Sequence, residues 1–139
     1  MKKLLFTSAL VLVGIFSIAQ NKEAEIKFEK TSHDFGTITE GTQATVEFEF
    51  TNTGNAPLIL NSVNASCGCT TPEWTREPIP PGQTGTIKAV YNSSGRPGSF
   101  SKSITVNSNA KSGTKILSIR GTVEPKKAAP ASPVENKPQ

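Results

Sequence analysis

The chain has 139 residues, of which 35% are hydrophobic and 19% are charged, a length and composition typical of one globular domain. Its 15 basic and 11 acidic residues give a net charge of +4, and two of the basic residues, Lys2 and Lys3, lie in a predicted leader. This net charge is too small to indicate a surface that binds nucleic acid, so we expect no nucleic-acid partner.

Residues 1–19 have the pattern of a secretory signal peptide. Two lysines are followed by an apolar run from Leu4 to Ile18, and small residues precede a cleavage point after Ala19. The run is about 15 residues long, shorter than the ~20 that a transmembrane helix needs, so we expect no stable membrane span after cleavage. The pattern predicts an exported protein of the periplasm or the extracellular space.

The mature part shows apolar and polar residues in alternation, broken by turn signals. Val46, Phe48 and Phe50 alternate with polar residues, which is the period of a strand with one buried face. Further segments bounded by Gly, Pro and Asn lie at residues 26–35, 58–63, 87–91, 100–106 and 116–123. The first of these supplies one or two strands, which gives about seven in all. This pattern predicts an all-β, immunoglobulin-like antiparallel β-sandwich, with a small barrel as the alternative.

Three parts of the chain are therefore expected: the signal peptide at residues 1–19, the sandwich at residues 20–123, and a disordered tail rich in Pro, Ala and Lys at residues 124–139. Lys102 is an exception in its strand, because it falls in register with the apolar residues. The predicted core of the sandwich consists of Phe28, Phe35, Val46, Phe48, Phe50, Leu58, Leu60, Val63, Ile87, Ala89, Phe100, Ile104, Val106, Leu117, Ile119 and Val123.

Several short motifs, taken as a set, resemble those of a known family. They are His33-Asp34-Phe35-Gly36-Thr37-Ile38, Glu40-Gly41, Phe48-Glu49-Phe50-Thr51-Asn52-Thr53-Gly54, Pro57-Leu58, Ser66-Cys67-Gly68-Cys69-Thr70 and Pro81-Gly82-Gln83-Thr84-Gly85. Together they resemble the exported bacterial family called domain of unknown function 1573, which is similar to Hydin-type immunoglobulin-like domains. The resemblance covers about Ile26 to Val123. It implies a seven-stranded sandwich and no particular activity.

Cys67 and Cys69 form the sharpest candidate site. Residues two apart in an extended chain point to the same side, and Gly68 between them permits a bend or a close approach. Four roles are compatible with the pair: a short structural disulfide, a reducible disulfide used in thiol exchange, a site for a soft metal such as Cu(I) or Zn(II), and a linkage to cysteines of a partner. A loop this short removes little chain entropy when it is closed, so a stabilising role is not obvious.

Three other positions are weighed against ordinary structural roles. His33 is the only histidine and is either a third metal ligand or a packing residue before a strand. Phe35 is expected to enter the core, and Gly36 to make a turn. Trp74, near several prolines, is either an exposed patch for a partner or a residue that closes the sandwich. Arg96 and Lys102 are expected to be solvated charges.

No catalytic motif stands in the sequence, so an enzyme is not expected and no cofactor is assigned. The leading hypothesis is a non-catalytic binding or scaffold module of the cell envelope, with a protein partner that binds at a sheet edge or a surface patch. The alternative is a redox or soft-metal-handling protein that uses the Cys67-Gly68-Cys69 motif.

Overall fold

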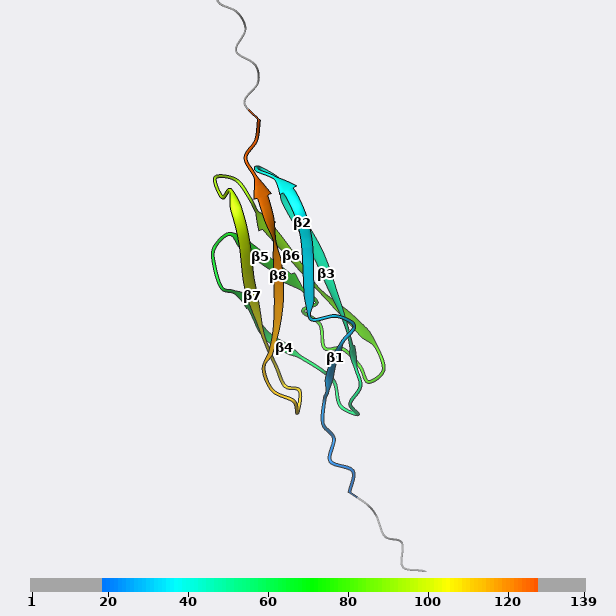
Figure 1. Ribbon diagram of the computed structural model, residues 1–139. Coiled ribbons are helices and arrows are strands. Elements are labelled where there is room, and N and C mark those ends of the chain that lie inside the picture. The colour runs from blue at the N-terminus through cyan, green and yellow to red at the C-terminus, as the bar shows by residue number, and fades with distance from the viewer. Residues whose placement is uncertain (1–18, 128–139) are drawn as a thin grey trace, which may run out of the picture.

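The computed structural model describes residues 19–127, which form two β-sheets of four strands each (Figure 1). One sheet has the strand order β1-β3-β6-β5 and the other β2-β8-β7-β4. In chain order the strands are β1 (Ile26–Phe28), β2 (Ser32–Thr39), β3 (Gln43–Asn52), β4 (Leu60–Ala65), β5 (Thr70–Trp74), β6 (Thr84–Asn92), β7 (Gly98–Ser108) and β8 (Lys115–Glu124). The predicted β-sandwich is confirmed. Across the described residues there is no helix with the length and apolarity that crossing a membrane requires.

Alternation along the strands builds the core between the two sheets. In β3, Val46, Phe48 and Phe50 are buried, while the residues between them are exposed. The antiparallel register of β3 and β6 sets Phe48 opposite Ile87, so both strands turn their apolar faces to the same side. All strand pairs are antiparallel except β2 with β8, which run parallel.

The observed core contains fourteen of the sixteen predicted residues. Phe28 and Phe35 are the two exceptions, because both are half-buried and pack against the edge of the cluster. The fold adds buried residues that the pattern did not single out as core: Ala24, Ile26, Ala44, Cys69, Ile79, Tyr91 and Ala110.

Strand β5 was missed by the sequence prediction, which explains why eight strands are found where about seven were expected. Pro72 lies within it, and proline is normally a signal against a strand. However, the N–H of Asn92 donates to the carbonyl of Cys69 at 2.8 Å, and the N–H of Thr75 donates to the carbonyl of Thr86 at 3.2 Å. Since backbone groups alternate in an antiparallel pair, Pro72 turns its nitrogen to the free edge and costs the sheet no hydrogen bond.

Gly36 does not make a turn as expected. It lies inside β2, where the pairing with β8 shifts register between Asp34 and Thr37. Its φ of 65° is left-handed, and its N–H donates to Asp34 Oδ1 at 2.8 Å. The glycine therefore serves a β-bulge, a distortion that often requires this residue.

The Asn52-Thr53-Gly54 part of the family motif has a structural role. Asn52 is fully buried at the end of β3, and its side-chain nitrogen donates to the carbonyls of Ala56 at 2.7 Å and Ile79 at 2.9 Å. Its Oδ1 accepts the N–H of Gly54 at 3.0 Å. The asparagine thus satisfies the backbone of the turn after β3, as a buried polar group must.

The predicted signal peptide falls almost entirely outside the described residues. Residues 128–139 of the predicted tail also lie outside the described residues. At its start, Glu124 still belongs to β8, and its carbonyl accepts the N–H of Glu40 at 2.8 Å. The folded unit thus includes one residue that the sequence prediction assigned to the tail.

Candidate functional site at the Cys67–Cys69 turn

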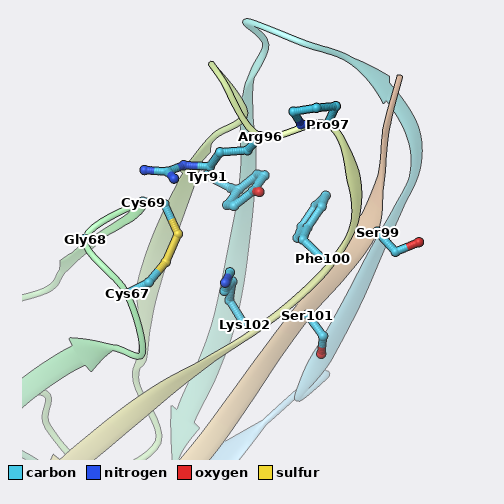
Figure 2. A pocket seen from close by; sticks show the side chains of 10 residues that line it. All are labelled: Cys67, Gly68, Cys69, Tyr91, Arg96, Pro97, Ser99, Phe100, Ser101 and Lys102. Atoms are coloured by element: carbon cyan, nitrogen blue, oxygen red, sulfur yellow. A yellow bond between two sulfur atoms is a disulfide. The ribbon is translucent and has the colours of Figure 1, made fainter. Parts of the chain in front are cut away.

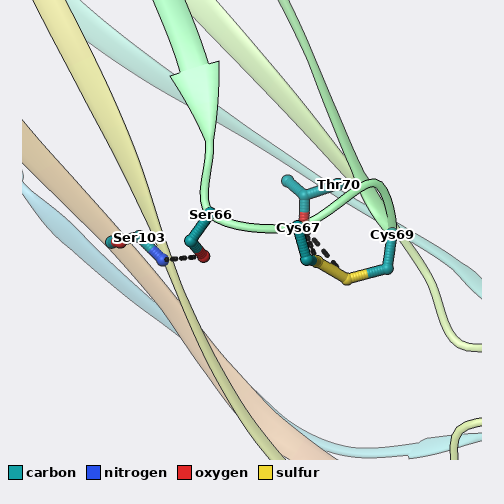
Figure 3. Close-up of a disulfide and its surroundings, with 5 residues drawn as sticks. All are labelled: Ser66, Cys67, Cys69, Thr70 and Ser103. Carbon is teal, nitrogen blue, oxygen red and sulfur yellow. Dashed lines mark hydrogen bonds between the residues drawn. A yellow bond between two sulfur atoms is a disulfide. The ribbon is translucent and has the colours of Figure 1, made fainter.

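The two cysteines lie in the turn that carries the chain from β4 in one sheet to β5 in the other (Figure 3). Ser66 prolongs the ladder with β7, since its N–H donates to the carbonyl of Ser103 at 2.8 Å and its Oγ accepts the N–H of Ser103 at 3.1 Å. On the other side of the turn, Cys69 is already held by β6 through its carbonyl. Both ends of the turn are therefore fixed by sheet hydrogen bonds.

Cys67 and Cys69 are joined in a disulfide, with their Cα atoms 5.3 Å apart. Cys69 is buried, with 6% of its surface exposed, whereas Cys67 is only half-buried. The buried hydroxyl of Thr70 lies 3.9 Å from the sulfur of Cys67 and 4.0 Å from that of Cys69. Because a disulfide sulfur carries no hydrogen, the hydroxyl is the donor in both contacts.

Gly68 is exposed at the tip of the turn. Its φ lies outside the left-handed region, and a Cβ built on it would meet no atom within 4 Å. The chain does turn at Gly68, as the sequence predicts, but in a backbone conformation that other residues also adopt. The position is open to solvent directly above the disulfide.

The disulfide forms one wall of an open cleft of about 540 Å³, and the opposite wall is the segment from Arg96 to Lys102 at the start of β7 (Figure 2). Tyr91 lines the cleft beside Phe100 of that wall. Their rings are stacked, with centroids 3.9 Å apart and an angle of 14° between the planes. The pair joins the two sheets, because Tyr91 comes from β6 and Phe100 from β7.

Two cations line this cleft without a carboxylate beside them. Lys102 lies in β7 opposite the buried Ile119, in register with Phe100 and Ile104, and is half-buried. Figure 2 shows the side chain of Lys102 rising from β7 into the cleft, while that of Arg96 extends along the rim. The ion pairs formed among residues 19–127 involve other cations, in the pairs Lys88–Glu73, Lys111–Glu23 and Arg120–Asp34.

The sequence predicts solvated surface charges for Arg96 and, despite its inward register, for Lys102. Arg96 is indeed exposed, whereas Lys102 is half-buried at the cleft. In the sequence, the only indication that Lys102 is half-buried is its place among the apolar residues of β7.

His33 does not join the cysteines. It lies in β2, and its ring contacts that of Phe35 edge-to-face at a centroid distance of 4.6 Å. In the described part of the chain, no three His, Cys, Asp or Glu side chains gather closely enough to hold a metal ion. The structure therefore supports the packing role of His33.

Trp74 ends β5 opposite Ile87 and packs, half-buried, against the core. The guanidinium of Arg76 lies 3.5 Å from the centre of its ring, a close cation–π contact. Its Nε1 is buried and has no hydrogen-bond partner among residues 19–127. The indole thus lies at the margin of the sandwich, with a charged side chain across its face.

Asp34 lies in the β2 bulge rather than at the cysteine cleft. The pKa of its carboxyl is lowered from the ordinary 3.8, first by the N–H of Gly36 and then by the side chain of Arg120. Arg120 Nε donates to Asp34 Oδ2 at 2.9 Å, and both side chains are exposed. Asp34 therefore belongs to a surface ion pair.

Known structures with a similar architecture come from several kinds of protein. A protein of unknown function from Porphyromonas gingivalis W83 has a TM-score of 0.64 at 18% identity, over 75% of this chain and 50% of that one. PapD-like domain 7 of human CEP192 also has a TM-score of 0.64, at 10% identity, over 90% of this chain and 100% of that domain. The YadV chaperone has a TM-score of 0.50 at 17% identity, over 74% and 53%. These identities show a shared fold alone.

This chain spans half of the Porphyromonas gingivalis protein and 23% of another similar structure, the secreted serine protease VesC from Vibrio cholerae. None of the curated proteins compared with the chain matches it significantly. The family model described as "Protein of unknown function (DUF1573)" matches residues 26–123, which cover all eight strands except the last residue of β8. The chain therefore belongs to the DUF1573 family of immunoglobulin-like domains of unknown function.

Proposed function

We propose that the chain is a non-catalytic binding module, exported to the bacterial cell envelope, that takes a protein partner by strand addition at β4. The observation that carries this proposal is an unpaired backbone edge along β4. Export is inferred from the leader pattern of residues 1–19. The immunoglobulin-like fold is compatible with a binding role, and it prescribes no partner.

The free edge of β4 follows from its pairing with β7. The N–H of Ser66 donates to the carbonyl of Ser103, and the register continues back along β4 through Asn64. Since hydrogen-bonding residues alternate, Asn64 turns its backbone groups to β7, and Val63 and Ala65 turn theirs outward. β4 pairs with no other strand of the described chain. Two donors and two acceptors are thus available to an extended peptide.

The other three edges are less suited to receiving a strand. β1 has only three residues. β5 carries Pro72, whose nitrogen faces the free side and has no hydrogen to donate. β2 is interrupted by the bulge at Gly36. β4, with six residues and no proline, is the remaining template.

Trp74 was the other candidate contact for a partner. Its packing against the core and the guanidinium of Arg76 over its ring support a role in closing the sandwich. YadV is described as a chaperone, but at 17% identity it shares the fold and does not transfer that role. The proposal therefore rests on the β4 edge.

The test places a photo-crosslinking amino acid at Asn64, whose side chain is exposed, and irradiates intact cells. Ala65→Pro removes one outward N–H and leaves the ladder to β7 intact, as Pro72 does in β5. Ala65→Ser keeps the N–H and is the matched control. We expect a discrete crosslinked product for the control and its loss in Ala65→Pro, with both variants folded by circular dichroism.

Two results would contradict the proposal. One is the absence of any discrete crosslink from Asn64 in a protein that reaches the cell envelope. The other is an Ala65→Pro variant that folds and crosslinks as well as Ala65→Ser.

A further inference from the structure

The cysteine cleft has features that strand addition at β4 does not use. An accessible disulfide, a half-buried lysine and an arginine face one open space, and no carboxylate lines it. We propose that Cys67–Cys69 is a site of thiol–disulfide exchange with thiols that enter this cleft, and that Lys102 stabilises the thiolate formed there. This activity is independent of the binding role proposed above.

Exposure decides which sulfur is attacked. Cys67 is half-buried and faces the cleft, whereas Cys69 is 6% exposed. An incoming thiolate attacks Cys67 Sγ, a new bond forms between the two sulfurs, and the Cys67–Cys69 bond breaks. The electron pair of that bond leaves with Cys69 as a thiolate. A second thiol of the same class completes the reduction, and the reverse sequence oxidises a dithiol.

Two groups are placed to stabilise the departing thiolate. Thr70 Oγ1 lies 4.0 Å from Cys69 Sγ and 3.9 Å from Cys67 Sγ, and these sulfurs are its only hydrogen-bond partners in the described structure. A hydroxyl donates more strongly to a thiolate than to a disulfide sulfur, since a charged acceptor shortens and strengthens the bond. The contact therefore tightens as the disulfide opens.

Lys102 is the second group, and it supplies a positive charge to stabilise the thiolate. Its position on the core-facing side of β7 would suit an apolar residue, because its strand neighbours on that face are Phe100 and Ile104. Its stem can pack there while the amine reaches the cleft. A cation beside a thiol lowers the thiol pKa and favours the reduced form. Arg96 at the rim adds to the same field.

The accessibility of the two sulfurs, on which the assignment of the attacked sulfur depends, is compared with single-cysteine variants of the purified protein. Cys69→Ser leaves Cys67 free, and Cys67→Ser leaves Cys69 free. Each is mixed with oxidised glutathione, and formation of the mixed disulfide is followed by mass spectrometry. We expect Cys67 to react roughly tenfold faster than Cys69 or more, because access controls exchange. Equal rates, or a faster Cys69, would overturn the assignment.

The role of Lys102 is tested by measuring the pKa of a cysteine thiol. A lysine that served only in packing would not change this pKa when replaced. In the Cys67→Ser background, the rate of alkylation by iodoacetamide against pH gives the pKa of Cys69, the thiol that departs when the disulfide opens. We expect it below the ordinary ~8.5 and raised by roughly one unit in Lys102→Met. Lys102→Arg retains the charge and should retain the low pKa. Lys88→Met, on the outer face of the other sheet, is the control and should leave it unchanged.

Equilibration of the intact disulfide with glutathione completes the test. Lys102→Met should shift the equilibrium toward the disulfide by about tenfold, which is about 30 mV for a two-electron couple. The proposal fails if Lys102→Met and Lys88→Met behave alike in both measurements. It also fails if glutathione cannot open the Cys67–Cys69 disulfide while circular dichroism shows the protein to be folded.

Discussion

The contact between Phe50 and Gly85 offers a quantitative test of the sandwich. The two residues are paired across β3 and β6, and the ring of Phe50 is fully buried. A Cβ built on Gly85 would lie 2.6 Å from Phe50 Cζ and 2.8 Å from Cδ1 of Ile79. The ring therefore occupies the space that a side chain at position 85 would need, which makes the two positions energetically coupled.

Magnitudes follow from this geometry. Phe50→Ala should cost about 3–5 kcal/mol of unfolding free energy, because a buried ring is lost and a cavity is left. Gly85→Ala alone should cost about 1–3 kcal/mol, since its methyl group overpacks the core. In the double variant the methyl group enters the space left by the ring, so its cost should fall. We expect a coupling energy of at least ~1 kcal/mol, partly limited by the remaining contact with Ile79.

Urea denaturation, monitored by the fluorescence of Trp74, the single tryptophan, measures the unfolding free energy of all three variants. Equal m-values are required for the comparison. Glu49→Ala, on the exposed face next to Phe50, is the control and should change stability by no more than about 0.5 kcal/mol. Additive single-variant costs in the double variant would refute the packing argument. A larger effect at Glu49 than at Phe50 would place β3 in the wrong register.

The remaining predictions concern the two ends of the chain, its surface charge and the disulfide. N-terminal sequencing of protein from cell-envelope fractions should begin at Gln20, and recovery of only full-length protein from the cytoplasm would contradict export. Truncation directly after Glu124 should leave the Tm nearly unchanged in a thermal melt, and a fall of many degrees would show that the tail docks on the sandwich. The depressed pKa of Asp34 means that its contribution to stability is present above pH 3.8 and is lost as the pH falls through the folded-state value. An NMR titration should show a midpoint below 3.8 for this carboxyl, and an ordinary midpoint would contradict the ion pair. Replacing Cys67 and Cys69 together by serine should cost less than about 2 kcal/mol in urea denaturation, because the closed loop is so short; failure of this variant to fold would show that the disulfide is structural.

Local patterns in the sequence were enough to determine the class of the fold and most of its core. The alternation around Phe48 and Phe50 predicts a strand with one buried face, and both residues are fully buried. This works because successive side chains of a strand point to opposite sides, a property of the chain itself.

The tertiary structure decided what local patterns cannot encode. Whether Pro72 disrupts a strand depends on which way its nitrogen faces, and this is set by the phase of the hydrogen bonds between β5 and β6. The free edge of β4 is fixed in the same way by its pairing with β7.

The candidate site is also a product of the assembled sheets. Cys67 and Cys69 stood out in the sequence, but Lys102 and Arg96 lie about thirty residues further along the chain. They reach the disulfide only because β7 lies beside β4 in one sheet, while β5 belongs to the other. The electrostatic character of the cleft therefore depends on long-range strand order, which the spacing of two cysteines does not contain.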